Sequence, residues 1–169
     1  MVEVLRSDAR RNRERLIATA RRLFSARGVD VPVEDITQDA GVGMGTLYRH
    51  FPTKEDLIDA VLEHAFEEYL ALADAGLERE DAWVGLEVFL DGALAAHGAN
   101  RGLAEVAGHR VTAMRRRLRP KLREHATRTG LDAADLEVVL QGGAGVIDRS
   151  PGAEARRRYL RIVLAGLRA

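Results

Sequence analysis

The chain contains no cysteine, which excludes a disulfide framework and zinc sites built on cysteine thiolates. Aromatic residues make up only 5% of its 169 residues. No stretch approaches the roughly 20 apolar residues that a membrane-spanning helix needs, and no N-terminal segment joins a basic start to an apolar run. These absences predict a cytoplasmic protein with no membrane partner.

Neither sign of charge dominates, since 26 basic and 26 acidic residues give a net charge of zero. The distribution is uneven, because the first 54 residues hold ten Arg or Lys against seven Asp or Glu. The remainder has the opposite, acidic excess. This small asymmetry is compatible with a nucleic-acid-binding N-terminus but does not predict one by itself.

Good helix formers dominate what is present, chiefly Ala, Leu, Arg and Glu. Hydrophobic residues make up 46% of the chain, enough for a buried core, and Val and Ile never alternate with polar residues over the length of a strand. The sequence therefore predicts an all-α protein. The apolar periodicity places helices at about residues 8–27, 33–40, 44–51, 54–73, 80–97, 101–109, 110–129, 132–149 and 153–167.

Several local signals refine these helices. Ser7 or Asp8 can cap the first helix, and Thr53 with Asp56 forms an approximate capping box before the fourth. Pro120 is expected to kink or split the helix over 110–129. Three glycines, Gly142, Gly143 and Gly145, lie inside a predicted helix at a cost of about 1 kcal/mol each, so a packing reason for them is expected.

Two short helices, 33–40 and 44–51, are joined by Gly41-Val42-Gly43, which is typical of a helix-turn-helix. The side chains expected to face the core are Ile36, Ala40, Val42, Leu47 and Phe51. Those expected to stay exposed on the second helix are Met44, Gly45, Thr46, Tyr48, Arg49 and His50. Small residues, hydroxyls, an imidazole and a guanidinium suit contacts with phosphates and base edges, and Lys54 adds a cation nearby. The segment predicts binding to double-stranded DNA.

Other interpretations of these and other residues stay open. The helix-turn-helix segment could be a structural three-helix bundle without a DNA role. Glu105 and His109 are four residues apart and could ligate a metal, although an ion pair or a core-edge histidine is favoured and no metal site is predicted. The basic run 115–123 could bind nucleic acid, but on a helix its charges spread around the cylinder, which favours a solvated face.

The segment GVGMGTLYRHFPTKEDL resembles the signature of the TetR/AcrR family of regulators, and RERLIATARRLFSARG resembles that family's first helix. The resemblance covers about residues 10–65. It implies a three-helix DNA-binding domain at 1–53 and a helical effector-binding and dimerisation domain at 54–169, with 54–73 as the connecting helix. It also implies DNA contacts from Thr46, Tyr48 and His50, a backbone contact from Lys54, and base readout by Met44, Gly45 and Arg49.

Three positions depart from the family pattern. Members often have Ser or Thr where this chain has Pro32 and Gly43, and Ala where it has Thr37. Because glycine is an acceptable cap, we expect altered local stability and a lost phosphate contact, with DNA binding retained.

The C-terminal half resembles the family more loosely. DLEVVLQGGAGVI and ARRRYLRIVLAGLRA resemble its last two helices, which in relatives pair with their copies in a four-helix interface. The implied dimer residues are Leu136, Val139, Leu140, Gly143, Val146, Tyr159, Leu160, Val163 and Leu167. Core packing is expected for the apolar residues upstream, and the hypothetical lining of an effector cavity is Trp83, Leu86, Phe89, Leu90, His97 and Met114.

Taken together, these features favour a ligand-responsive repressor that binds a palindromic operator as a homodimer. The effector is an unidentified small molecule, and no cofactor is expected. A helical enzyme or carrier is the alternative from another class, but no catalytic triad order, phosphate-binding Gly loop or carboxylate pair supports catalysis. An activator or a nonspecific DNA binder is a second alternative.

Overall fold

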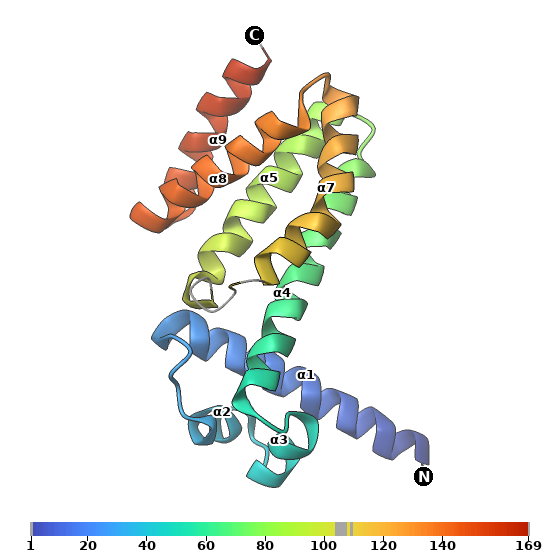
Figure 1. Cartoon of the computed structure of the whole chain (residues 1–169), viewed down its shortest axis with the longest axis vertical. Helices are drawn as coiled ribbons and strands as arrows, with labels where there is room; N and C mark the ends of the chain where they lie inside the picture. Colours follow the sequence, from blue (N-terminus) through green and yellow to red (C-terminus); the bar gives the residue numbers. More distant parts are fainter. Residues whose placement is uncertain (1, 104–107, 109, 169) are drawn as a thin grey trace. The chain divides into compact units, whose positions relative to one another are not determined.

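The computed structural model describes residues 2–103, 108 and 110–168, and every regular element in those ranges is a helix (Figure 1). The helices are α1 (Val2–Arg27), α2 (Val33–Ala40), α3 (Met44–His50), α4 (Lys54–Leu77), α5 (Ala82–Ala99), α7 (Arg110–Thr129), α8 (Ala133–Arg149) and α9 (Ala153–Leu167). The all-α prediction is confirmed. Most of the helix predicted over 101–109 lies outside the described residues.

The chain divides into two compact units. The first runs to Ala65 and includes the segment that begins at Gly102; the second holds Phe66–Arg101 and the chain from Gly108 onward. The division therefore falls inside α4, whereas the sequence placed a functional boundary at Lys54. That functional boundary stays a prediction.

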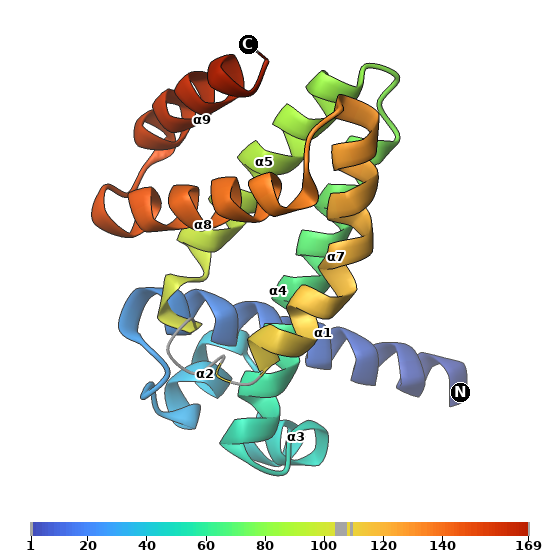
Figure 2. The same cartoon turned by 45° about the horizontal axis from the view of Figure 1, so that its top comes forward.

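The core of the first unit forms where α2 and α3 pack on α1 and on each other (Figure 2). Its buried side chains include Leu16, Ile17, Ala20, Leu23, Phe24, Ile36, Ala40, Leu47, Phe51, Leu57 and Val61. Burying one such side chain contributes roughly 1.5–3 kcal/mol, so these short helices depend on α1 for their stability.

Two helix starts test the capping predictions. The box at α4 is confirmed, because the Thr53 backbone N–H donates to the Asp56 carboxylate (2.9 Å) and the Asp56 N–H donates to the Thr53 hydroxyl (3.1 Å). The cap expected at Ser7 or Asp8 is wrong, since α1 already begins at Val2. Asp8 instead accepts a hydrogen bond from Arg11, one turn on, which suits a helix interior.

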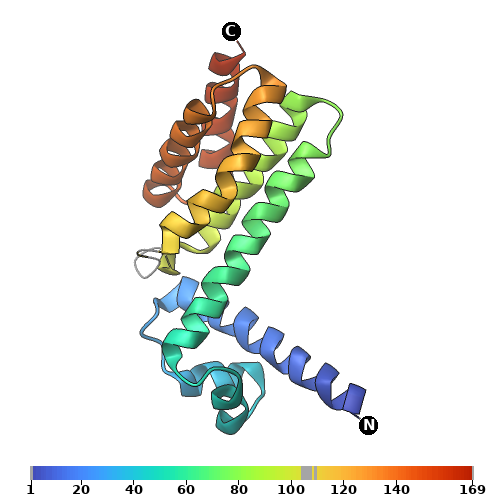
Figure 3. The same ribbon diagram turned by 45° about the vertical axis from the view of Figure 1, so that its right-hand side comes forward.

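The second unit is built around α5, which packs against α7, α8 and α9. Leu86, Phe89, Leu90 and Leu94 of α5 are completely or almost completely buried. Figure 3 shows α4 and α7 running alongside one another in this unit, where Lys121 of α7 hydrogen-bonds to Asp74 of α4.

Pro120 does not split α7, which continues from Arg110 to Thr129. Proline removes only one helical hydrogen bond, and Leu118 and Leu122 on either side are buried in the core. Packing therefore holds both halves of α7 in one helix. The split, one of the two expected outcomes, is wrong, and the kink stays a prediction.

Candidate nucleic-acid interface

The turn between α2 and α3 begins at Gly41, whose φ of 64° lies in the left-handed region that favours glycine. The Gly41 N–H donates to the Gln38 carbonyl (3.1 Å), and the Val42 N–H donates to that of Thr37 (3.0 Å). Arg15 of α1 adds a long-range contact, because its guanidinium donates to the carbonyl oxygens of Ala40 and Gly41. The turn is thus held by its own backbone and by α1.

The three departures from the family pattern have local structural counterparts. Pro32 and Gly43 occupy the N-cap positions of α2 and α3, and neither makes a side-chain capping bond. Thr37 is buried, and its hydroxyl donates to the Glu34 carbonyl one turn earlier (2.9 Å). That bond satisfies the buried hydroxyl, so threonine is accommodated where the family often has alanine.

One side of α3 is fixed in the core and the other faces outward. Leu47 is completely buried and Phe51, directly after the helix, is 2% exposed. The residues predicted for DNA contact lie on the remaining surface: Gly45, Tyr48 and Arg49 are exposed, and Met44, Thr46 and His50 are half-buried. Lys54, at the start of α4, is also half-buried. The predicted outward orientation of α3 agrees with the structure, while the DNA contacts themselves stay a prediction.

His50 has an unusual environment at the end of α3. Its Nε2 atom is buried and has no hydrogen-bond partner among the described residues. Burial, together with the positive charges of Arg49 and Arg13, lowers the pKa of the His50 imidazole. The Arg13 guanidinium lies over the Phe51 ring, 5.3 Å from its centroid.

The contacts of Arg13 and Arg15 were not predicted from the sequence. A signal for Arg13 was present, because it continues the stripe formed by Leu16, Ile17 and Ala20 one turn toward the N-terminus. Its position on that stripe predicts a side chain lying against the following helices. The contact of Arg15 with the turn had no such signal, since Arg15 is itself exposed.

The residues of α8 and α9 that were predicted to form the dimer interface pack largely within the chain. Leu136, Val139, Gly143 and Leu160 are buried, and Leu140, Val146, Tyr159, Val163 and Leu167 are half-buried. The exposed large apolar side chains of these helices are instead Val138 (67% exposed) and Ile162 (62%). An interface between chains stays a prediction, and the outward faces that could form it carry a different set of side chains.

The glycine cluster of α8 has the expected packing reason at two positions. A Cβ atom on Gly143 would lie 2.6 Å from a methyl carbon of Leu94 and 2.9 Å from the Tyr159 ring. One on Gly142 would lie 2.9 Å from the Tyr159 hydroxyl, which donates to the Val139 carbonyl (2.6 Å). These glycines let α8 approach α5 and α9 within one chain.

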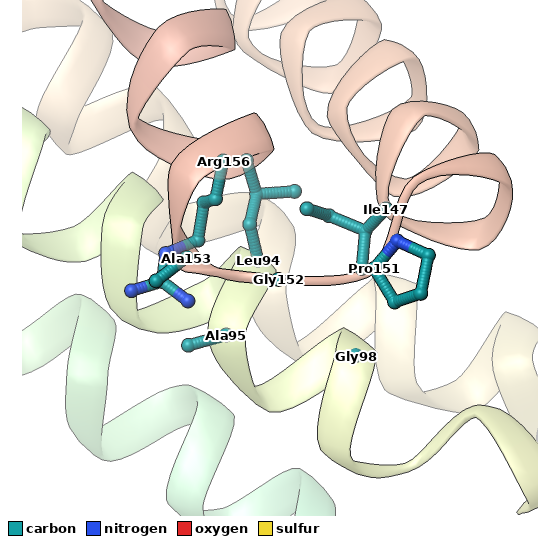
Figure 4. Close-up of a pocket in the computed structure, with 8 residues that line it drawn as sticks. All are labelled: Leu94, Ala95, Gly98, Ile147, Pro151, Gly152, Ala153 and Arg156. Carbon is teal, nitrogen blue, oxygen red and sulfur yellow. The ribbon is translucent and has the colours of Figure 1, made fainter.

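The residues predicted to line an effector cavity mostly pack in the core. Leu86, Phe89 and Leu90 are fully buried, and Trp83 and Met114 pack against the same cluster. His97 hydrogen-bonds to Asp148 (2.9 Å). A pocket of about 190 Å³ lies elsewhere in this unit; its lining, drawn in Figure 4, is Leu94, Ala95, Gly98, Ile147, Pro151, Gly152, Ala153 and Arg156.

Other sequence candidates gain no support as sites. The side chains that the structure describes include no group of three acidic, histidine or cysteine residues able to hold a metal, and Glu105 and His109 lie outside the described residues. Within the basic run of α7, Arg117, Arg119 and Lys121 pair with Glu67, Glu137 and Asp74. These ion pairs favour a solvated helix face over a nucleic-acid site for the run 115–123. None of the described helices is long and apolar enough to cross a bilayer.

Comparison with known proteins connects this geometry to a family. The family described as bacterial regulatory proteins, tetR family, matches residues 16–61. The HTH-type transcriptional regulator SAUSA300_2515 of Staphylococcus aureus is 39% identical over 67 residues, which is 39% of this chain and 36% of that protein. The chain thus matches only about a third of the length of that curated relative.

Solved structures extend the similarity over nearly the whole chain. A TetR transcription regulatory protein from Mycobacterium vanbaalenii is 31% identical with a TM-score of 0.76, covering 98% of this chain and 99% of that one. The regulator SCO0520 from Streptomyces coelicolor is 27% identical with a TM-score of 0.70, covering 92% and 98%. The protein is a DNA-binding transcriptional regulator of helix-turn-helix type. It belongs to the TetR family of transcriptional regulators, and this family is not enzymatic.

Proposed function

We propose that this chain is a ligand-responsive repressor that binds a palindromic operator as a homodimer. The observation that carries the proposal is the two-sided burial of α3, with Leu47 completely buried and Tyr48, its neighbour in the chain, 47% exposed. Such a helix is anchored on one side and free to enter a major groove on the other. Binding to chromosomal DNA would place the protein in the cytoplasm.

Each residue of the outward surface has a chemical role in this proposal. Thr46 and Tyr48 donate hydrogen bonds to phosphates, His50 does so through Nδ1 because its Nε2 is buried, and Lys54 supplies a cation for another phosphate. Met44, Gly45 and Arg49 contact base edges. Nothing lies within 4 Å of the place where a Cβ atom of Gly45 would be, so that backbone can approach a base closely. Arg49 has no ion pair among the described residues and can form a bidentate contact with guanine.

The proposed dimer uses the outward faces of α8 and α9. Val138 and Ile162 supply apolar area, while Gly145 and Ala165 let a partner helix approach closely. Asp135 on α8 and Arg158 and Arg161 on α9 are all exposed, so a two-fold arrangement can bring opposite charges together. A two-fold pair presents two copies of α3 to successive major grooves, about 34–36 Å apart.

The proposed effector binds in the second unit and changes the equilibrium between DNA-binding and released arrangements. A ligand can do this only through different affinities for the two arrangements. The core around Phe89 is closed in this structure, and the 190 Å³ pocket is small for a typical ligand site. A ligand that separates packed side chains would therefore favour a different arrangement from the one seen here.

The experiment is selection of genomic fragments by the purified protein, followed by fluorescence anisotropy on the recovered sequence. We expect a palindromic site bound at least about a thousandfold more tightly than random DNA of equal length at physiological salt. Arg49→Ala should weaken operator binding by about tenfold or more, while Arg116→Ala, an exposed arginine of α7 without an ion pair among the described residues, leaves it unchanged. Equal affinity for operator and random DNA would overturn the proposal.

A further inference from the structure

Arg13 stands on the side of α1 that packs against α3. The buried residues Leu16, Ile17 and Ala20 define that side, and Arg13 continues it one turn earlier, where the core ends. Its guanidinium lies 5.3 Å from the centroid of the Phe51 ring. An arginine over an aromatic face is attracted by the ring quadrupole, so Phe51 holds this side chain at the C-terminal end of α3.

Most of the other described arginines of α1 have different partners. Ion pairs join Arg10 to Glu14, Arg11 to Asp8, Arg22 to Asp39 and Arg27 to Asp35. Arg15 is bonded to the carbonyl oxygens of the turn. Arg13 is exposed and has no carboxylate partner among the side chains that the structure describes. Its charge is therefore not neutralised locally, and its N–H donors are available.

Arg13 lies in a positively charged region at the C-terminal end of α3. Arg13 and Arg49, from different helices, both act electrostatically on His50. The C-terminal end of a helix is its negative pole, so a phosphate approaching the end of α3 is repelled unless cations surround it. The Arg13 guanidinium, which comes from α1, supplies such a cation at the end of α3.

We propose that Arg13 is a DNA phosphate anchor, which binds a backbone phosphate beside the end of α3 while Phe51 holds its guanidinium in place. The inference rests on the proposed entry of α3 into the major groove. It adds a contact from α1, outside the helix-turn-helix segment itself. Such a contact sets how deeply and at what tilt α3 sits, and carries no base preference.

The test compares Arg13→Ala with Arg10→Ala, a matched change one turn away on the same helix in a residue that has an acidic partner. Affinities for the selected operator and for random DNA of equal length are measured by anisotropy over a series of salt concentrations. We expect Arg13→Ala to weaken binding to both DNAs by about tenfold and to reduce the slope of log K against log salt by about 0.9. Arg10→Ala should match the wild type, and Arg13→Lys should keep the wild-type slope.

The possible outcomes separate this inference from the proposed function. A salt slope unchanged by Arg13→Ala, an equal loss in Arg10→Ala, or a loss confined to the operator would each overturn the phosphate anchor. If the wild type prefers no sequence, the proposed function fails, yet the slope on random DNA still decides the role of Arg13. Thermal melting of both variants checks that each remains folded.

Discussion

Gly76 and Gly85 bring the backbones of α4 and α5 into direct contact: a Cβ atom on Gly85 would lie 2.2 Å from the Gly76 carbonyl oxygen. No side-chain rotation can relieve such a contact, because the obstructing atom belongs to the backbone. The pair therefore fixes how closely the two helices cross at this point.

Replacing Gly85 with alanine should lower the free energy of unfolding by about 1–3 kcal/mol, as expected for overpacking in a core. Urea denaturation followed by circular dichroism measures the change. The matched control is Gly166→Ala in α9, where nothing lies within 4 Å of the added carbon. Alanine there should raise stability by about 0.5–1 kcal/mol, because glycine is the poorer helix former. Equal effects at both positions would contradict the close crossing.

His125 should make stability depend on pH. The side chain is 1% exposed, its Nε2 atom lies 3.0 Å from the Ala73 carbonyl oxygen, and its ring stacks on Phe89 with centroids 5.0 Å apart. Burial lowers the pKa of this imidazole in the fold, so the unfolded chain binds the proton more readily. The free energy of unfolding should therefore fall as pH drops below about 6.5, the pKa of an unperturbed histidine, and continue to fall toward the lowered folded value.

The measurement for His125 is urea denaturation at a series of pH values between 5 and 8. His125→Gln should flatten the acid side of the profile, whatever its effect on absolute stability. His64→Gln, a change in an exposed histidine of α4, should leave the slope as in the wild type. The lowered pKa of His50 leaves a smaller slope in His125→Gln, whereas a slope as steep as in the wild type would assign the pH dependence to another group.

The capping box formed by Thr53 and Asp56 at the start of α4 should contribute measurably to stability. Asp56→Ala removes the acceptor of the Thr53 backbone N–H and of the Thr53 hydroxyl. Loss of a cap of this kind costs about 1 kcal/mol. Glu55→Ala, a neighbouring exposed acid in the same helical turn, should cost less. Differential scanning calorimetry on both variants checks the ranking, and an equal loss would argue against the capping box.

If the proposed dimer forms, a charge placed on its interface should lower the mass of the particle in solution without changing the fold of the chain. Ile162→Glu places a charge on the outward face of α9 and should shift sedimentation from dimer toward monomer at unchanged helix content. Val84→Glu introduces the same charge at an exposed apolar position of α5 and should leave the mass unchanged. A stable Ile162→Glu dimer would place the interface elsewhere.

Short-range patterns made most of the helices and buried positions in the first 60 residues predictable. Buried positions such as Leu16, Leu47 and Phe51 follow helical spacing, and the turn is marked by Gly41. The capping box could be identified because Thr53 and Asp56 are three residues apart. All these features depend on neighbours within a few positions along the chain.

Features formed between distant segments could not be predicted in the same way. Periodicity shows that Leu136 and Leu160 face an apolar surface, but it does not show whether that surface belongs to the same chain or a partner, and here it is the same chain. Likewise, the apolar spacing of Leu86 and Phe89 is the same for a filled core and for a cavity wall. Only the packing of α7 and α8 around α5 distinguishes them.

The hydrogen bonds from Arg15 to the carbonyl oxygens of Ala40 and Gly41 have a consequence for engineering. A synthetic peptide limited to α2 and α3 would lack the guanidinium that holds its bend. A chimaeric regulator made to carry this DNA specificity must therefore be joined ahead of α1, so that it includes Arg15 together with the turn between α2 and α3.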